Sequence, residues 1–195
     1  MSRRFRSPLQ PPERLRYTAS NEAPPAQGET IVLPDGRQLL MRPIHPADVK
    51  ALQRGFSHLS HEEVRLRFLH VMSELPEEMA ARLCQLDDEH EIAFVLVSPD
   101  ENGENEIHAV VRAFIDTVTT SAEFALIVQK AYTGHGLGLH LMQHLIEACR
   151  ARGVTELWGD VLAENHAMLQ MCEALGFERH SAFHDAGVMR VTRAL

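Results

Sequence analysis

The 195-residue sequence lacks a long apolar run and has few cysteines. No stretch approaches the about 20 apolar residues that a membrane-spanning helix needs, and the arginines near the start have no apolar segment behind them to form a signal peptide. We therefore expect a cytoplasmic protein with no membrane partner. The three cysteines, Cys84, Cys149 and Cys172, are widely separated and form no CxxC motif, which disfavours a disulfide framework and a structural zinc site.

Positive charge is also scarce and unevenly placed. The formal net charge is -8, and Lys50 and Lys130 are the only lysines. The first sixteen residues contain five arginines against one glutamate, so the rest of the chain is more acidic than the total suggests. Because sequence-independent nucleic-acid binding depends on cationic side chains that neutralise phosphates, this balance argues against a nucleic-acid partner.

The N-terminal segment differs in composition from the rest of the chain. Residues 1–28 hold five of the ten prolines and few aliphatic side chains. Such a segment cannot bury enough apolar surface to offset the entropy lost on ordering. We expect a flexible arm containing Pro and Arg over 1–28, or an arm that docks on its own domain or on a second subunit, and one folded domain over 29–195.

Local patterns predict a mixed order of strands and helices. The turn Pro34-Asp35-Gly36 predicts a hairpin of strands 30–33 and 38–44, and Ser60 with Glu63 forms a capping box for a helix. The other expected elements are helices over 46–56, 60–69, 76–86, 137–152 and 165–175 and strands over 91–97, 106–115, 122–128, 157–162, 177–183 and 188–192. With one or two late parallel crossovers, this order predicts an α/β fold distinct from a repeating doubly wound sheet.

Three glycines alternate in the stretch Thr133-Gly-His-Gly-Leu-Gly138, between a predicted strand and a predicted helix. Glycines let backbone N–H groups converge, and the helix N-terminus adds a positive dipole, so the loop suits a phosphate group. A Walker A loop would end in Gly-Lys-Ser/Thr, and a dinucleotide loop would need glycine where Leu139 stands. The pyrophosphate of coenzyme A is the third candidate ligand.

This loop resembles the signature (Gln/Arg)-x-x-Gly-x-(Gly/Ala) of the GNAT superfamily of N-acetyltransferases, with Thr133 as a departure at the first position. The stretch 165–177, in which Asn165 opens a helix that ends in Gly-Phe, is similar to the second signature of that superfamily. Asn is also a favoured helix N-cap. The resemblance covers 30–193 and implies the GNAT fold: a mixed, mostly antiparallel sheet flanked by helices, with a splayed strand pair that holds acetyl-CoA as co-substrate and no metal.

Within the superfamily, the stretches 59–68, 122–125 and 159–169 look like the catalytic domain of bacterial Pat-type protein lysine acetyltransferases. This resemblance implies that Glu123 is the general base and that the partner is a protein with an acceptor lysine, such as an acyl-CoA synthetase. Together with the loop argument, it assigns acetyl-CoA contacts to Ile127, Val128, Thr133, Gly134, His135, Gly136, Leu137, Gly138, Leu139 and Asn165, with backbone N–H groups near Ile127 and Val128 facing the thioester.

The role of Glu123 also has a physical argument. A lysine amine is protonated near neutrality, so a carboxylate within reach can take its proton. Strand alternation puts Glu123 on one face with Ala125 and Ile127. The alternatives are an exposed glutamate on an edge strand or a structural ion pair. Two other functions stay open, a small-molecule amine N-acetyltransferase and an acyl-CoA-sensing module without turnover.

Three further groups of residues carry weaker signals. Cys172 occupies the position where many GNAT members have a tyrosine, but a cysteine on an apolar helix face usually packs in the core. His140 and His144 have the i, i+4 spacing of metal ligands but no neighbouring acid completes a motif, so we expect ordinary surface residues. We expect the helices between 46 and 86 to rim an open acceptor cleft, where negative charge comes from Glu62, Glu63, Glu77 and Glu78.

Overall fold

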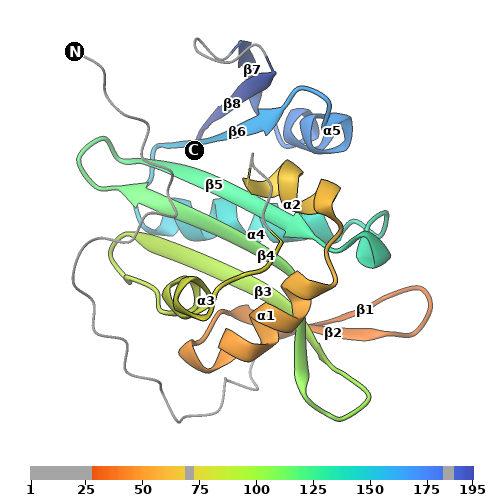
Figure 1. The fold of residues 1–195 in the computed structure, drawn as a ribbon. Helices are drawn as coiled ribbons and strands as arrows, with labels where there is room; N and C mark the ends of the chain where they lie inside the picture. The colour runs from red at the N-terminus through yellow and green to blue at the C-terminus, as the bar shows by residue number, and fades with distance from the viewer. Residues whose placement is uncertain (1–27, 69–72, 182–186) are drawn as a thin grey trace.

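The computed structural model describes residues 28–68, 73–181 and 187–195. Their strands form one sheet in the order β1-β2-β3-β4-β5-β6-β8-β7 (Figure 1). The strands are β1 (Glu29–Val32), β2 (Gln38–Pro43), β3 (Glu91–Pro99), β4 (Asn105–Asp116), β5 (Ser121–Val128), β6 (Glu156–Leu162), β7 (Glu178–Ser181) and β8 (Val188–Ala194). The helices are α1 (Val49–Ser57), α2 (His61–Phe68), α3 (Glu77–Cys84), α4 (Leu137–Ala151) and α5 (His166–Ala174), with 3-10 turns η1 (Pro46–Asp48) and η2 (Lys130–Tyr132).

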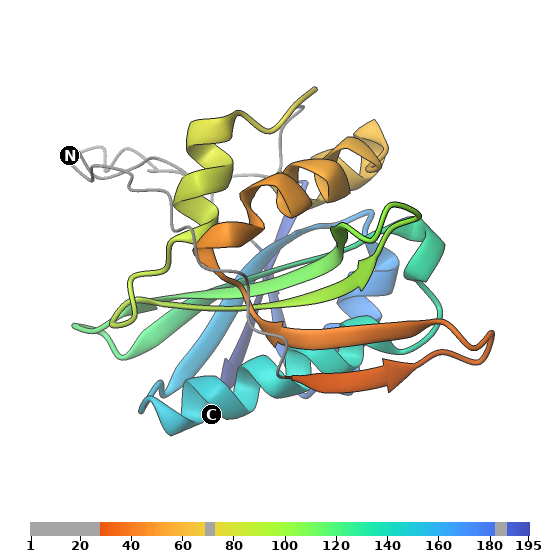
Figure 2. The ribbon, with the colours of Figure 1, turned by 90° about the horizontal axis from the view of Figure 1, so that it is seen from below.

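The sheet confirms the predicted fold class. Among the described strands, β5 and β6 form the parallel pair and the other neighbouring strands are antiparallel. Helices cover both faces, with α1, α2 and α3 on one side and α4 on the other (Figure 2). Apart from Gly28, the predicted arm lies outside the described residues, as do residue 69 of the predicted helix 60–69 and residues 182–183 of the predicted strand 177–183.

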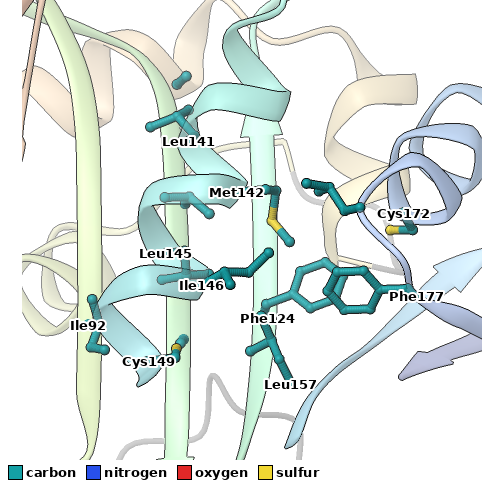
Figure 3. Packing of buried hydrophobic residues seen from close by; sticks show 14 of the residues in the cluster. Ile92, Phe124, Leu141, Met142, Leu145, Ile146, Cys149, Leu157, Cys172 and Phe177 are labelled. Atoms are coloured by element: carbon teal, nitrogen blue, oxygen red, sulfur yellow. The ribbon is translucent and has the colours of Figure 1, made fainter. Parts of the chain in front are cut away.

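The main core lies between α4 and the sheet. Apolar side chains recur along α4 at helical spacing, so one face of the helix is buried. Leu141, Leu145, Ile146 and Cys149 from that face pack toward the sheet, where Ile92 of β3 lies beside them (Figure 3). This packing fixes α4, and with it the glycine-rich loop at its start, against β3, β4 and β5.

A buried ion pair joins the end of β2 to the start of the first helical segment. Arg42 donates to both carboxylate oxygens of Asp48 at 2.7 and 2.8 Å, and both side chains are 1% exposed. Asp48 also accepts a hydrogen bond from the backbone of His45 at 2.8 Å. His45 and Asp48 form a capping box at η1, so the predicted helix 46–56 begins as this 3-10 turn and becomes α-helical at Val49.

The parallel pairing of β5 with β6 is short. Pairing runs from Ser121 with Glu156 to Glu123 with Trp158, although both strands continue beyond it. At the point of divergence, the ring of Phe124 lies against Gly159, where a Cβ atom would come within 2.7 Å of the ring. The Phe124 ring also packs edge-on against Phe177 at 5.3 Å (Figure 3). The predicted splayed strand pair is therefore present.

Gly55 lets α1 approach β4 at backbone distance. A Cβ atom on this residue would lie 2.0 Å from the carbonyl oxygen of Ile107. The Gly55 carbonyl in turn accepts a hydrogen bond from the buried side chain of Gln129 at 3.1 Å. The contact leaves no room for a larger residue at this position.

We expect Gly55→Ala to lower the free energy of unfolding by about 1–3 kcal/mol, the usual cost of overpacking. In an unstrained helix the same change stabilises by up to about 1 kcal/mol, so the sign of the effect is diagnostic. Urea denaturation followed by circular dichroism measures it. Lys50→Ala, at an exposed position of the same helix, serves as the control and should change the midpoint little. A Gly55→Ala variant as stable as the wild type contradicts the close approach.

Candidate functional site

The glycine-rich loop has an open backbone at the start of α4. Gly134 has φ +80° and Gly136 has φ +76°, in the left-handed region that favours glycine. A Cβ atom on either residue would meet no atom within 4 Å. Among the described residues, no side chain caps α4. Since the first N–H groups of a helix have no partner within it, this end offers several donors and the positive end of the helix dipole, which suits a pyrophosphate.

The other loop residues hold this backbone in place. The Thr133 hydroxyl and N–H both bind the carbonyl oxygen of Lys130, at 2.8 and 3.2 Å. Leu137 is buried in the core, and a Cβ on Gly138 would lie 3.4 Å from the Leu126 side chain. His135 is exposed. The predicted loop residues therefore lie together, and most of what they offer a ligand is backbone N–H.

The edge of β5 beyond Glu123 faces the gap left by β6. The N–H of Gln129 donates to the carbonyl of His108 at 2.9 Å, which sets the alternation of the ladder between β4 and β5. Every second residue of β5 points its N–H to the same neighbouring strand. Ile127, two residues before Gln129, therefore directs its N–H toward β4, whereas Leu126 and Val128 direct theirs to the side of β6. Near Ile127 and Val128, where the sequence predicts backbone donors, the N–H groups on the open side are therefore those of Leu126 and Val128, and their contact with a thioester stays a prediction.

Glu123 sits at the last residue pair before the two strands separate. Burial raises the pKa of its carboxyl to about 7, with a further upward contribution from Asp160 and opposing contributions from Arg67 and Arg190. The side chain of Ile127 lies on the same strand face and lines, with Arg67, a cavity of about 50 Å³ beneath α1 and α3. A carboxyl group with this pKa can exchange a proton near neutral pH.

An ion pair between Asp160 of β6 and Arg190 of β8 lies near Glu123. The sequence analysis did not single out this pair. Arg190 donates to both oxygens of Asp160 at 2.8 and 2.6 Å, and its guanidinium lies 4.2 Å from the centre of the Trp158 ring. Trp158 and Asp160 alternate along β6, so they share the sheet face of Glu123, the register partner of Trp158. The alternation was visible in the sequence, but the pairing of β6 with β5 was not.

Asn165 and Cys172 have structural roles in α5. The Asn165 side chain accepts a hydrogen bond from the N–H of Met168 at 3.2 Å and so caps the helix. A contact of Asn165 with a cofactor stays a prediction. Cys172 is fully buried in the main core, and burial raises the pKa of its thiol to about 11. This agrees with the expectation that it packs.

Glu63 is committed to interactions within the chain. One carboxylate oxygen accepts from the backbone N–H and the hydroxyl of Ser60, which confirms the predicted capping box. The other accepts from the N–H of Lys130 at 2.7 Å and ties α2 to the end of β5. Both carboxylate oxygens of Glu63 are therefore engaged within the chain, and its expected contribution to the charge of the acceptor rim stays a prediction. Glu62, Glu77 and Glu78 are exposed.

The turn between β1 and β2 reaches the glycine-rich loop. The guanidinium of Arg37 lies 4.6 Å from the centre of the Tyr132 ring and pairs with Asp35 at 2.7 Å. The loop has Thr133 where the signature has Gln or Arg. Arg37 is thus a cationic candidate for a phosphate contact that sequence reasoning missed, because only the folded hairpin brings it to the loop.

Comparison with known proteins gives consistent matches. The sequence model of the Acetyltransferase (GNAT) family matches residues 57–177. An acetyltransferase of Pseudomonas aeruginosa is 31% identical over 145 residues, 74% of this chain and 77% of that protein. The ribosomal protein bS18-alanine N-acetyltransferase of Escherichia coli (strain K12) is 36% identical over 77 residues, 40% of this chain and 50% of that protein.

A solved structure extends the match in three dimensions. The GNAT domain of S. lividans PAT aligns with a TM-score of 0.76 and 26% identity, over 89% of this chain and 100% of that domain.

Among the described helices, none has the length and apolar character needed to cross a membrane.

We expect Gly136→Asp to weaken acetyl-CoA binding at least about tenfold, because a carboxylate would stand where the loop accepts phosphates. Gly136→Asn is the matched control. Asn tolerates the left-handed conformation as Asp does but carries no charge, so it should lose less affinity. Isothermal titration calorimetry with acetyl-CoA measures both variants. Equal affinities for the Asp and Asn variants would show that the anion lies elsewhere.

Proposed function

The chain belongs to the GNAT acetyltransferase family, and from this premise we propose that it transfers the acetyl group of acetyl-CoA to lysine side chains of a protein, with Glu123 as general base. Acetyl-CoA is the co-substrate of this family. In this proposal its pyrophosphate binds the backbone of the loop 133–139, and its thioester lies at the open edge of β5. The observation that carries the proposal is the position of Glu123, with its raised pKa, at the fork between β5 and β6.

The chemistry follows from the groups at that fork. The ionised Glu123 carboxylate takes a proton from the lysine ammonium, and the neutral nitrogen attacks the thioester carbon. The N–C bond forms as the C–S bond breaks, and the acylated nitrogen releases its second proton to solvent. The N–H groups of Leu126 and Val128 donate to the carbonyl oxygen, which gains negative charge in the transition state. The leaving thiolate takes its proton from solvent, since the nearest candidate on α5, Cys172, is buried.

A protein acceptor is supported by two observations. The match to the GNAT domain of S. lividans PAT covers nearly the whole chain, and the sequence resembles Pat-type enzymes that modify protein lysines. In addition, α2 and α3, on the Glu123 side of the sheet, present the exposed carboxylates of Glu62, Glu77 and Glu78. The similarity to a ribosomal-protein alanine N-acetyltransferase favours a second candidate, an N-terminal amine of a protein.

The direct test is incubation of the protein and isotopically labelled acetyl-CoA with a lysate of the source cells, followed by mass spectrometry of labelled peptides. Label on lysine side chains supports the proposal. Label confined to N-terminal amines supports the second candidate, and label confined to small amines supports a small-molecule enzyme. Binding of acetyl-CoA without thiol release on any amine would identify an acyl-CoA-sensing module.

We expect kcat/KM of the wild type to rise with pH through about 7, because Glu123 accepts a proton only above its pKa. Glu123→Gln should lower turnover by about 10²–10⁴-fold and remove this inflection, with acetyl-CoA affinity little changed. Its activity should recover partly toward pH 10, where lysine loses its proton unaided. Thiol release with a folded acyl-CoA synthetase as acceptor gives the profile.

A second variant separates the base from its surroundings. Asp160→Asn removes a charge that raises the pKa of Glu123 and leaves the cationic Arg190 nearby, so the inflection should move to lower pH. An inflection that stays at the same pH in Asp160→Asn and survives in Glu123→Gln would assign the titration to another group.

We also expect kcat/KM for a folded acyl-CoA synthetase to fall as the salt concentration rises. The carboxylates on α2 and α3 would raise the rate at which a basic acceptor protein associates, and salt screens such charges beyond about 8 Å at physiological ionic strength. The double change Glu77→Lys and Glu78→Lys should lower kcat/KM at low salt. Glu178→Lys, at an exposed position of β7, is the charge-matched control. Spermidine or free lysine as a better acceptor than every folded protein tested would contradict a protein substrate.

A further inference from the structure

A cluster of three potential metal ligands lies on the side of the sheet opposite Glu123. Glu29 is the first residue of the edge strand β1, and His140 and His144 stand one turn apart on α4. His140 Nε2 lies 3.1 Å from one carboxylate oxygen of Glu29, and His144 Nδ1 lies 4.0 Å from the other. One ligand atom from each residue falls within 4.8 Å of the others. The neighbouring acid that the sequence analysis did not find is therefore supplied by a distant strand.

These separations suit a small divalent ion. A tetrahedral ion with bonds of about 2.1 Å holds its ligand atoms about 3.4 Å apart, and the two histidine–Glu29 distances, each to a different carboxylate oxygen, lie on either side of this value, so small side-chain rotations would close the site. Imidazole nitrogen with one carboxylate oxygen is a donor set that Zn²⁺ uses in proteins, and three protein ligands leave a fourth position for water. Hard ions such as Mg²⁺ and Ca²⁺ prefer oxygen ligands throughout and fit this set poorly.

The surroundings of the imidazoles point to a ligand rather than to an ion pair alone. His140 Nε2 is shielded from solvent, yet it makes no hydrogen bond to the described residues despite its short distance to Glu29. A buried polar atom without a hydrogen bond is costly, and coordination to a metal would satisfy it. The ring of His144 packs edge-on against Phe94 of β3 at 5.8 Å, which limits how the ring can turn.

We propose that Glu29, His140 and His144 form a binding site for one transition-metal ion of the Zn²⁺ class. The site joins the edge strand β1 to the first two turns of α4, the helix that begins at the glycine-rich loop. The bound ion therefore acts as a cross-link that stabilises the folded chain. The proposal does not depend on the transfer reaction or on its acceptor.

The test uses the full chain without a histidine tag, stripped with a chelator and titrated with ZnCl₂ by calorimetry. We expect one equivalent to bind and the melting temperature to rise on its addition. Co²⁺ in place of Zn²⁺ should give the visible absorption of a tetrahedral site. Glu29→Gln, His140→Ala and His144→Ala should each weaken Zn²⁺ binding at least about tenfold. Mutating a residue that only hydrogen-bonds to a metal ligand already costs about tenfold or more in affinity, so loss of a ligand should cost at least as much.

The control is His180→Ala on β7, at the other end of the sheet, which should bind Zn²⁺ as the wild type does. All three ligand side chains are at least a third exposed, so the variants should stay folded when metal is absent. Saturable binding lost only in the three ligand variants supports the site. Wild-type binding no tighter than that of the His140→Ala/His144→Ala double variant overturns the proposal and leaves an ion pair.

Discussion

The parting of β5 from β6 is the constraint on which the rest of the site depends. Pairing stops at Glu123, where Phe124 fills the space beside Gly159. From there on, the N–H groups of Leu126 and Val128 face no strand among the described residues, and the carboxyl group at the fork is partly buried. The separation of β5 from β6 also leaves the N-terminus of α4, which follows β5 in the chain, uncovered by β6. The open edge of β5, the carboxyl group of Glu123 and the start of α4 thus adjoin one interruption of the ladder, and the roles proposed for all three depend on it.

Charges on the α1–α3 side of the sheet are mostly compensated, which sets Glu123 apart. Asp48 is fully engaged by Arg42, and Glu91 is shared by Arg82 and Arg112. These buried pairs hold β2, α3 and the sheet together at positions where a lone charge would be very costly. Glu123 instead receives opposing influences from Asp160 and two arginines, so burial dominates and its pKa rises. Unlike Asp48 and Glu91, Glu123 is therefore a carboxyl group whose pKa of about 7 lets it gain or lose a proton near neutral pH.

Features written in short stretches of sequence could be predicted, and features that need distant pairing could not. The loop 133–138, the capping box at Ser60 and the apolar face of α4 are local patterns, and all three are present. The direction of the N–H of Ile127 depends on how β5 pairs with β4. The second partner of Glu63 and the proximity of Glu29 to two histidines depend on chain segments far apart in sequence. The periodicity of apolar residues within a short stretch does not show which distant segments contact each other.

The burial of the cysteines has a consequence for the order of events during transfer. All three thiols lie in the cores, where burial raises the pKa of Cys84 to about 12 and those of Cys149 and Cys172 to about 11. Burial and a raised pKa disfavour an ionised thiolate at each of these positions, so the proposed transfer runs directly from acetyl-CoA to the amine and not through a cysteine of the chain. In that proposed route donor and acceptor occupy the protein at the same time, so the two must reach Glu123 by separate openings.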